Sequence, residues 1–231
     1  MPSWREFWDG AHSIYVNDRH KDVHYRDVAV QLAAFVPHPD AAVLDHGSGE
    51  AIYADLVANV ARQVYLCDAA ASVRAANAAH FKDNPKIKVL APEEVERLPD
   101  AALDLVFANS LVQYLTAAEL DRLLATWRRI LKASGTLIVA DVIPPHVGKV
   151  SDGFALLRYA AANGFLIAAL IGLTRTVLSP YLRIRSQLGI ARYDEAEFFA
   201  RLRAAGFSAE RLAKNVEQNP ARMTFRAQGA H

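Results

Sequence analysis

Short runs rich in Val, Leu and Ile alternate along this chain with segments of helical spacing, and this alternation restricts the fold more than any other feature. The runs cover residues 42–45, 63–67, 87–90, 103–108 and 136–143. Parallel strands need a crossover connection, which is usually a helix, so the alternation favours a parallel sheet with crossover helices.

The C-terminal part of the chain continues this pattern. A helix is expected from Asp194 to Ala205, where Gly206 stops it, and strands are expected from Phe207 to Ala213 and from Arg222 to Ala227. We therefore predict an α/β fold, with a doubly wound, mostly parallel seven-stranded sheet and helices on both of its faces.

The N-terminal residues 1–36 have apolar side chains at helical spacing, interrupted by a polar stretch from Asn17 to Arg26. We expect an N-terminal helical flap there. The following residues, 37–147, together with 193–231, are expected to form the core domain.

Composition restricts the partners and the compartment. The formal net charge is +1, from 26 basic and 25 acidic residues, so the chain lacks the basic excess that most nucleic-acid-binding proteins carry. A nucleic-acid partner is therefore disfavoured.

The single cysteine, Cys67, rules out an intramolecular disulfide framework, and no spacing suggests a metal site. Residues 1–10 do not resemble a secretory signal, and a cytoplasmic protein is expected.

Residues 148–192 differ from the rest of the chain. They contain six basic residues and one acid, which is a local charge of +5 and leaves −4 elsewhere. Within them, residues 159–174 are uncharged but shorter than the ~20 residues that span a bilayer. We expect a helical insertion with two alternative roles. It is either a lid over a hydrophobic substrate or, through 153–187, a peripheral contact with an anionic membrane on its inner face.

The most informative motif is an apolar strand that runs into a glycine turn at Asp45-His46-Gly47-Ser48-Gly49, with a helix expected to start near Glu50. The glycines let the backbone approach a ligand closely, and a helix N-terminus offers free N–H groups. The dinucleotide fingerprint needs a third glycine where Ile52 stands, and no Walker lysine follows. An acid at the strand end instead suits a cofactor with an amino-acid end.

Asp68 closes the next strand, 21 residues after Gly47. In this topology, an acid about 20 residues after the glycine turn accepts hydrogen bonds from ribose hydroxyls. Two separate elements therefore indicate an adenosyl ligand.

These motifs resemble those of class I S-adenosylmethionine-dependent methyltransferases, especially the "type 11" small-molecule group that includes quinone-biosynthesis enzymes. The resemblance extends from about Tyr15 to Ala227. The segments that carry it are VLDHGSGEA at 43–51, YLCDAA at 65–70, LDLVFANSLVQYL at 103–115 and LLATWRRILKASGTLIVADV at 123–142.

The resemblance implies a role for each matching position. The first motif would hold the methionine part of the cofactor, the second its ribose, and the end of the fourth strand would flank the sulfonium. It also implies a final antiparallel strand pair. The residues so assigned to S-adenosylmethionine, or to the product S-adenosylhomocysteine, are Asp45, Gly47, Ser48, Gly49, Asp68, Ala69, Asn109 and Ser110.

Three positions depart from the family pattern. Ala51 stands where the family usually has a third glycine, and no acid-small pair follows the third strand, where Pro92-Glu93-Glu94 lies instead. Asn109-Ser110-Leu111 is not the motif of methyltransferases that act on amino groups of bases, which argues against a nucleobase substrate.

Residues outside the motifs are candidates for contacts with cofactor and substrate. Tyr15 or Arg19 is expected either near the methionine carboxylate or on a solvated helix face. His146 follows the fifth strand and is a candidate general base. Asp141 and Tyr114 are candidates for orienting the substrate.

Together these observations predict an enzyme that transfers a methyl group from S-adenosylmethionine to a small hydrophobic acceptor, by direct displacement under a helical lid. Two alternatives stay open: a non-catalytic protein that senses S-adenosylmethionine, and a nicotinamide-dependent oxidoreductase. The sequence does not choose among a quinone precursor, a lipid, a polyketide-like metabolite and a phenol as acceptor, and it leaves the oligomeric state open.

Overall fold

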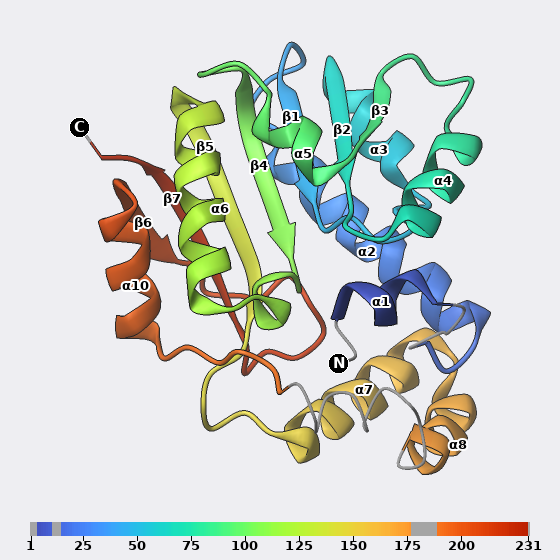
Figure 1. Ribbon diagram of the computed structural model, residues 1–231. Helices are drawn as coiled ribbons and strands as arrows, with labels where there is room; N and C mark the ends of the chain where they lie inside the picture. The colour runs from blue at the N-terminus through green and yellow to red at the C-terminus, as the bar shows by residue number, and fades with distance from the viewer. Residues whose placement is uncertain (1–3, 11–14, 177–188, 231) are drawn as a thin grey trace.

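The computed structural model describes residues 4–10, 15–176 and 189–230, and its centre is one seven-stranded sheet (Figure 1). The strand order is β3-β2-β1-β4-β5-β7-β6. β7 runs in the direction opposite to the other six strands and pairs antiparallel with both β5 and β6. The predicted mostly parallel sheet and its final antiparallel pair are therefore confirmed. The strands are β1 (Ala42–His46), β2 (Gln63–Cys67), β3 (Ile87–Leu90), β4 (Leu103–Asn109), β5 (Leu131–Val142), β6 (Phe207–Arg211) and β7 (Met223–Gly229).

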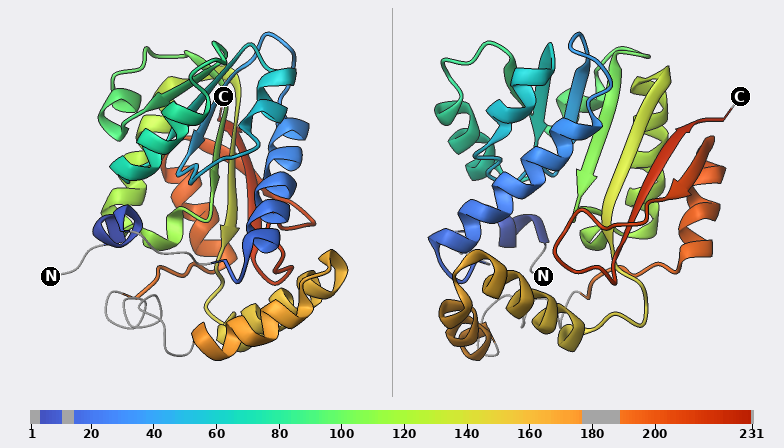
Figure 2. Two further views of the ribbon diagram at one scale, coloured as in Figure 1. Left: turned by 90° about the vertical axis from the view of Figure 1, so that its right-hand side faces the viewer. Right: turned by 180° about the vertical axis from the view of Figure 1, so that it is seen from behind.

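Helices cover both faces of the sheet, and each face has its own hydrophobic cluster (Figure 2). On one face Leu32, Val57 and Phe81 pack against the strands, and on the other face Trp127 and Phe198 do so. The doubly wound arrangement is thereby confirmed. The covering helices are α2 (Asp18–Phe35), α3 (Ala54–Val60) and α4 (Ala71–His80) on the first face, and α5 (Pro92–Glu96), α6 (Ala117–Ile130) and α10 (Glu195–Ala204) on the second.

Three element boundaries differ from those expected. The polar stretch from Asn17 to Arg26 does not interrupt a helix but forms the first half of α2, because the Asn17 side chain caps it by accepting the His20 N–H at 2.8 Å. The helix after the glycine turn begins at Ala54, not near Glu50. β5 begins at Leu131, five residues before the apolar run.

Three helices lie across the carboxyl ends of the strands: α1 (Trp4–Asp9), α7 (Lys149–Asn163) and α8 (Leu166–Thr176) (Figures 1 and 2). The uncharged run at 159–174 does not form one helix, because Gly164 adopts φ +78° and separates α7 from α8. Phe165 and Ala169 pack against Val23 of α2, which joins the insertion to the N-terminal region.

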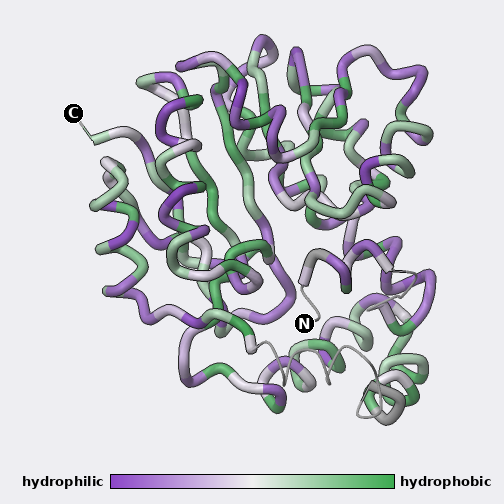
Figure 3. The backbone as a smooth tube through the Cα atoms, viewed as in Figure 1, coloured by the Kyte–Doolittle hydropathy of each residue, from purple (hydrophilic) through white to green (hydrophobic). Residues whose placement is uncertain are grey.

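Hydrophobic residues concentrate in the central strands and also along the insertion, as Figure 3 shows. No helix in the described part of the chain is long and apolar enough to cross a membrane.

Candidate functional site

A cavity of about 1800 Å³ opens at the carboxyl ends of β1 and β4. The strand order reverses between these two strands, and in open α/β sheets the crevice at such a switch point is where ligands bind. The cavity extends from the glycine turn after β1 to the helices that cover the strand ends, α1, α7 and α8.

The glycine turn after β1 is tightly held. The N–H groups of Gly47 and Ser48 both donate to the carbonyl of Cys67, at 2.7 and 3.0 Å. Gly49 adopts φ +56°, and a Cβ there would lie 2.7 Å from the Tyr25 hydroxyl. The position therefore requires glycine, as the motif predicts.

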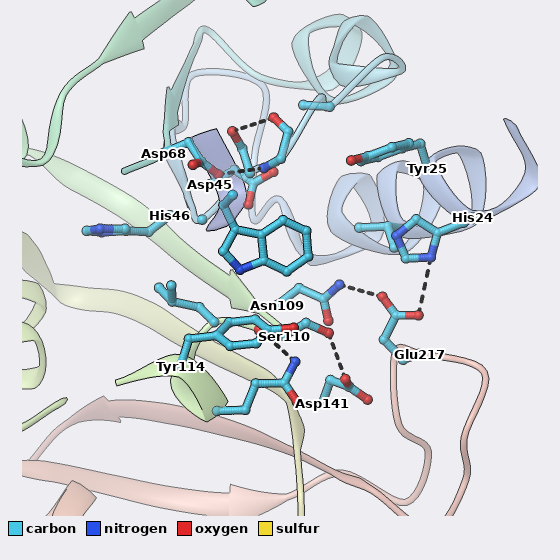
Figure 4. A pocket seen from close by; sticks show the side chains of 18 of the residues that line it. His24, Tyr25, Asp45, His46, Asp68, Asn109, Ser110, Tyr114, Asp141 and Glu217 are labelled. Carbon is cyan, nitrogen blue, oxygen red and sulfur yellow. Dashed lines mark hydrogen bonds and ion pairs between the residues drawn. The ribbon is translucent and has the colours of Figure 1, made fainter. Parts of the chain in front are cut away.

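Two carboxylates lie beside this turn (Figure 4). Asp68 accepts the Gly49 N–H at 3.0 Å and the Ala70 N–H at 2.9 Å, so it fixes both loops. Burial, followed by the negative charge of Asp68, raises the pKa of Asp45 to about 7. Burial also raises the pKa of Asp68. The two carboxyl groups therefore share a negative charge and part of a proton, and a bound cation beside them would stabilise their ionised forms.

Asn109 ends β4 and joins the cavity to the loop between β6 and β7. Its Nδ2 donates to Glu217 Oε1 at 2.6 Å, and because a carboxylate only accepts hydrogen bonds, this contact fixes the amide orientation. The buried Asn109 Oδ1 has no hydrogen-bond partner among the described residues. A buried acceptor of this kind, beside the cavity, can receive a donor from a bound molecule.

A buried polar network occupies the end of β5. Asp141, which is 2% exposed, accepts hydrogen bonds from Ser110 Oγ at 2.7 Å, Asn215 Nδ2 at 3.0 Å and Arg222 at 2.5 Å. Burial raises the pKa of Asp141, and Arg222 opposes this effect. Arg222 also binds Asp152 of α7 at 2.7 Å, so the network ties the insertion to the core.

Comparison with known proteins decides the class. Residues 44–139, which contain the glycine turn, Asp68 and Asn109, match the family described as a methyltransferase domain. Residues 44–139 are therefore similar in sequence to a methyltransferase domain. No curated protein sequence matches it.

Solved structures share the fold of this methyltransferase. A chain of the complex between the Haloferax volcanii Trm112 methyltransferase activator and a methyltransferase has a TM-score of 0.63 at 16% identity, with full coverage of both chains. Magnesium protoporphyrin IX methyltransferase from Synechocystis, with S-adenosylhomocysteine bound, has a TM-score of 0.60 at 16% identity and covers 98% of this chain and 93% of its own. An S-adenosylmethionine-dependent methyltransferase from Aquifex aeolicus gives 0.55 at 18%, with 88% of each chain covered. These structures share the fold, and together with the family match at residues 44–139 they bear out the predicted S-adenosylmethionine-dependent methyltransferase class.

The methyltransferase places most of the predicted residues around one cavity. Those that line it are Tyr15, Asp45, Gly47, Ser48, Gly49, Asp68, Ala69, Asn109, Ser110, Tyr114 and Asp141. Their individual contacts with cofactor and substrate stay predictions.

Two predicted residues lie elsewhere. Arg19 is on the exposed face of α2, where it pairs with Asp22 at 3.1 Å, so the solvated alternative describes it. His146 is also exposed, because a turn in which the Val147 N–H donates to the Pro144 carbonyl at 3.1 Å buries Val147 and turns His146 outward. The expected general base is therefore not at the cavity.

The sequence analysis missed several polar residues that line the cavity of the methyltransferase, among them His24, Tyr25, Glu217 and Arg222. The first two lie on the inner face of α2 and the others on the segment between β6 and β7. No short motif contains them, and only helical periodicity in α2 could have indicated that His20 and His24 share a face.

The cavity also has an aromatic wall. Tyr114, in the short helix η1 (Val112–Tyr114), contacts Trp4 and Trp8 of α1, with ring centroids 4.7 and 5.5 Å apart. All three side chains line the same cavity as the two carboxylates. Among the described residues, no group of acidic, histidine or cysteine side chains is arranged to hold a metal ion.

Proposed function

We propose that this methyltransferase transfers a methyl group from S-adenosylmethionine to a small hydrophobic acceptor bound beneath α1, α7 and α8. The observation that carries the proposal is one continuous cavity of about 1800 Å³, which is lined by both the acidic glycine turn and the aromatic wall. Ligand sites typically measure ~300–1000 Å³, so this volume suits a cofactor together with an acceptor.

The cofactor end of the cavity fits S-adenosylmethionine chemically. Gly49 leaves room for close approach, Asp68 keeps acceptor capacity for ribose hydroxyls, and Asp45 can face the cationic ammonium group. The unpartnered Asn109 Oδ1 supplies an acceptor at the end of β4. When bound, the cofactor supplies an electrophilic methyl group on a sulfonium.

The protein's own contribution to such a displacement is alignment and exclusion of water. The insertion is held over the cavity by ion pairs, because Arg222 binds both Asp152 of α7 and Asp141 at the end of β5. The hydroxyl of Tyr159 adds a second contact to α2, donating to Asp27 at 2.6 Å. We infer that α7 and α8 act as the lid.

The test is isothermal titration with S-adenosylhomocysteine and, separately, with NADH, followed by transfer of a labelled methyl group to lipid and soluble extracts. Binding of S-adenosylhomocysteine and a labelled product are expected. Binding of NADH alone would identify an oxidoreductase, and S-adenosylhomocysteine binding without transfer to either extract would identify a sensor.

We also propose that the lid contacts an anionic membrane from the cytoplasmic side. Phe154 of α7 and Ile167 of α8 are 71% and 76% exposed, and the basic side chain of Arg158, four residues after Phe154 on α7, is exposed as well. Apolar side chains next to basic ones suit anionic headgroups and the acyl boundary below them. Arg183 and Arg185, which belong to the predicted contact 153–187, lie outside the described residues.

Sedimentation with vesicles tests this contact. The double variant Phe154→Ser/Ile167→Ser should release the protein from vesicles that contain anionic lipid, while Val30→Ser, an equally polar change at an exposed residue of α2, should not. Binding should weaken as salt is added. If the wild-type protein ignores anionic vesicles at low salt, the insertion is a lid alone.

A further inference from the structure

Three histidines in the described part of the chain line the cavity, and two of them are already engaged. His46 Nδ1 accepts the indole N–H of Trp127 at 3.1 Å. His20 Nδ1 accepts the backbone N–H of Val16 at 3.3 Å. Burial, together with the neighbouring His24, lowers the pKa of His20 to about 4. His24 is the remaining histidine at the cavity.

His24 belongs to an ordered series of side chains. Its Nδ1 lies 3.4 Å from Glu217 Oε2, and the other carboxylate oxygen of Glu217 accepts the amide of Asn109 at 2.6 Å. Because the carboxylate attracts the Nδ1 proton, the neutral ring carries its lone pair on Nε2. Figure 4 shows one ring nitrogen of His24 directed at Glu217 and the other on the cavity side.

The charges around this pair keep the histidine basic. Burial lowers the pKa of His24, but Glu217 raises it more, so the pKa lies above its ordinary value. Burial raises the pKa of Glu217, but His24 and Asn109 lower it further, so Glu217 is ionised. The titratable or charged groups that face the pair are Tyr15, His20, Tyr25, Asp27, Asp141 and Arg222.

We propose that His24, positioned by Glu217, is the catalytic base that removes the proton from an aromatic hydroxyl acceptor. As the acceptor oxygen forms its bond to the methyl carbon, the carbon–sulfur bond breaks and its electron pair stays on sulfur. The hydroxyl proton moves to His24 Nε2, and the imidazolium is stabilised by Glu217. This inference rests on the proposed function, because that function supplies the methyl group.

The acceptor class follows from the base and from the aromatic side chains that line the same cavity. An aromatic hydroxyl has a pKa near that of tyrosine, ~10, so at neutral pH it needs a base to become a strong nucleophile. The aromatic wall of Trp4, Trp8 and Tyr114 offers ring faces and edges to a flat ligand. A thiol, with a pKa of ~8.5, has less need of a base, and an aromatic amine is already neutral at about pH 7. Together with the aromatic wall, the base therefore favours an aromatic hydroxyl acceptor.

The direct test uses 4-nitrophenol as the probe, because its phenolate is coloured and its phenol is not. The probe is added at pH 6 to the protein with S-adenosylhomocysteine bound. A larger phenolate fraction than in free solution is expected for the wild-type protein. His24→Gln should abolish the increase and Glu217→Gln should reduce it.

His146→Gln is the matched control, since it makes the same change at an exposed histidine that lies away from the cavity. The phenolate increase should survive this change. With S-adenosylmethionine and unsubstituted phenol, whose pKa of ~10 leaves it un-ionised at neutral pH, His24→Gln should slow methyl transfer by ~10²–10⁴-fold. The wild-type rate should increase with pH as His24 loses its proton, and this limb should vanish in the variant.

The outcomes separate the two proposals. If S-adenosylhomocysteine binds but the phenol does not, or if His24→Gln keeps both the phenolate signal and the rate, the base assignment is overturned. If S-adenosylhomocysteine itself fails to bind the wild-type protein, the proposed function fails and this inference fails with it. Should His24→Gln lose the folded near-ultraviolet dichroism signal, Glu217→Gln decides, because an unchanged phenolate fraction there also overturns the assignment.

Discussion

Asp45 should make cofactor binding depend on pH in a way that the structure quantifies. Its pKa rises from 3.8 to about 7, because burial and then the charge of Asp68 oppose its ionisation. If the ionised form faces the ligand ammonium, binding must release a proton at acid pH. A pKa of about 7 leaves roughly 10% of the site ionised at pH 6 and roughly 90% at pH 8. S-adenosylhomocysteine should therefore bind about tenfold more tightly at pH 8 than at pH 6.

Isothermal titration at several pH values, with Asp45→Asn beside the wild-type protein, measures this dependence. The variant should bind more weakly and lose the rise between pH 6 and 8. An α-amino group titrates at ~7.7–8.0, so the ligand itself loses charge in the upper part of the range. Because that effect acts on both proteins, the ratio of their dissociation constants isolates Asp45.

The same substitution has an opposite effect on the ligand-free protein. A carboxyl whose pKa is raised on folding destabilises the protein increasingly as pH rises from the unfolded value to about 7, and by a constant amount above it. The rise from 3.8 to about 7 corresponds to an upper value on the order of 4 kcal/mol. Asp45→Asn should therefore raise the melting temperature at pH 8 and have little effect near pH 4. A wild-type affinity that is flat from pH 6 to 8, or equal melting temperatures at pH 8, would refute this reasoning.

Three further substitutions test other parts of the structure. Asp68→Ala should weaken S-adenosylhomocysteine binding by ~1.5–3 kcal/mol in calorimetry, through lost hydrogen bonds to a charged acceptor; an unchanged affinity would contradict the assignment. Gly49→Ala should reduce binding because its Cβ would lie 2.7 Å from the Tyr25 hydroxyl, and Tyr25→Phe in the same chain should restore part of it; equal affinities for both would show that backbone strain dominates. Lys132→Met should destabilise the protein in urea by roughly 1–3 kcal/mol, since Asp104 is 5% exposed and loses a partner at 2.7 Å, while cofactor affinity stays unchanged because the pair lies at the opposite end of the strands.

The sheet could be predicted because its signals are local. Each apolar run needs only a few consecutive residues to specify a buried strand, and the glycine turn is contiguous with β1. The predicted interruption from Asn17 to Arg26 was wrong, and the reason is also local. Its first half exposes Asp18, Arg19 and Arg26 and buries only His20 and Val23, so its composition alone resembles that of a loop. The decisive contact is the Asn17 cap, which does not depend on hydrophobicity.

The acceptor side of the site could not be predicted, because tertiary structure assembles it from distant segments. His24 and Glu217 are 193 positions apart and meet because α2 packs beside the loop between β6 and β7. Arg222 reaches Asp141 across 81 positions. His146 had the better local argument, since it follows a strand that ends at the site, but one backbone turn directs it to solvent.

Backbone strain gives a second indication of the site, independent of family likeness. In the described part of the chain, four non-glycine residues have positive φ, and three of them line the cavity: Ala51 at +43°, Ser110 at +52° and Asp141 at +65°. Such conformations cost about 1–3 kcal/mol each and persist only where surrounding contacts enforce them. Ser110 and Asp141 enforce each other through their 2.7 Å hydrogen bond, and Arg222 holds Asp141 from the other side. Strained residues of this kind cluster at functional sites, so their position at the ends of β4 and β5 supports the view that these strand ends are shaped for a bound ligand.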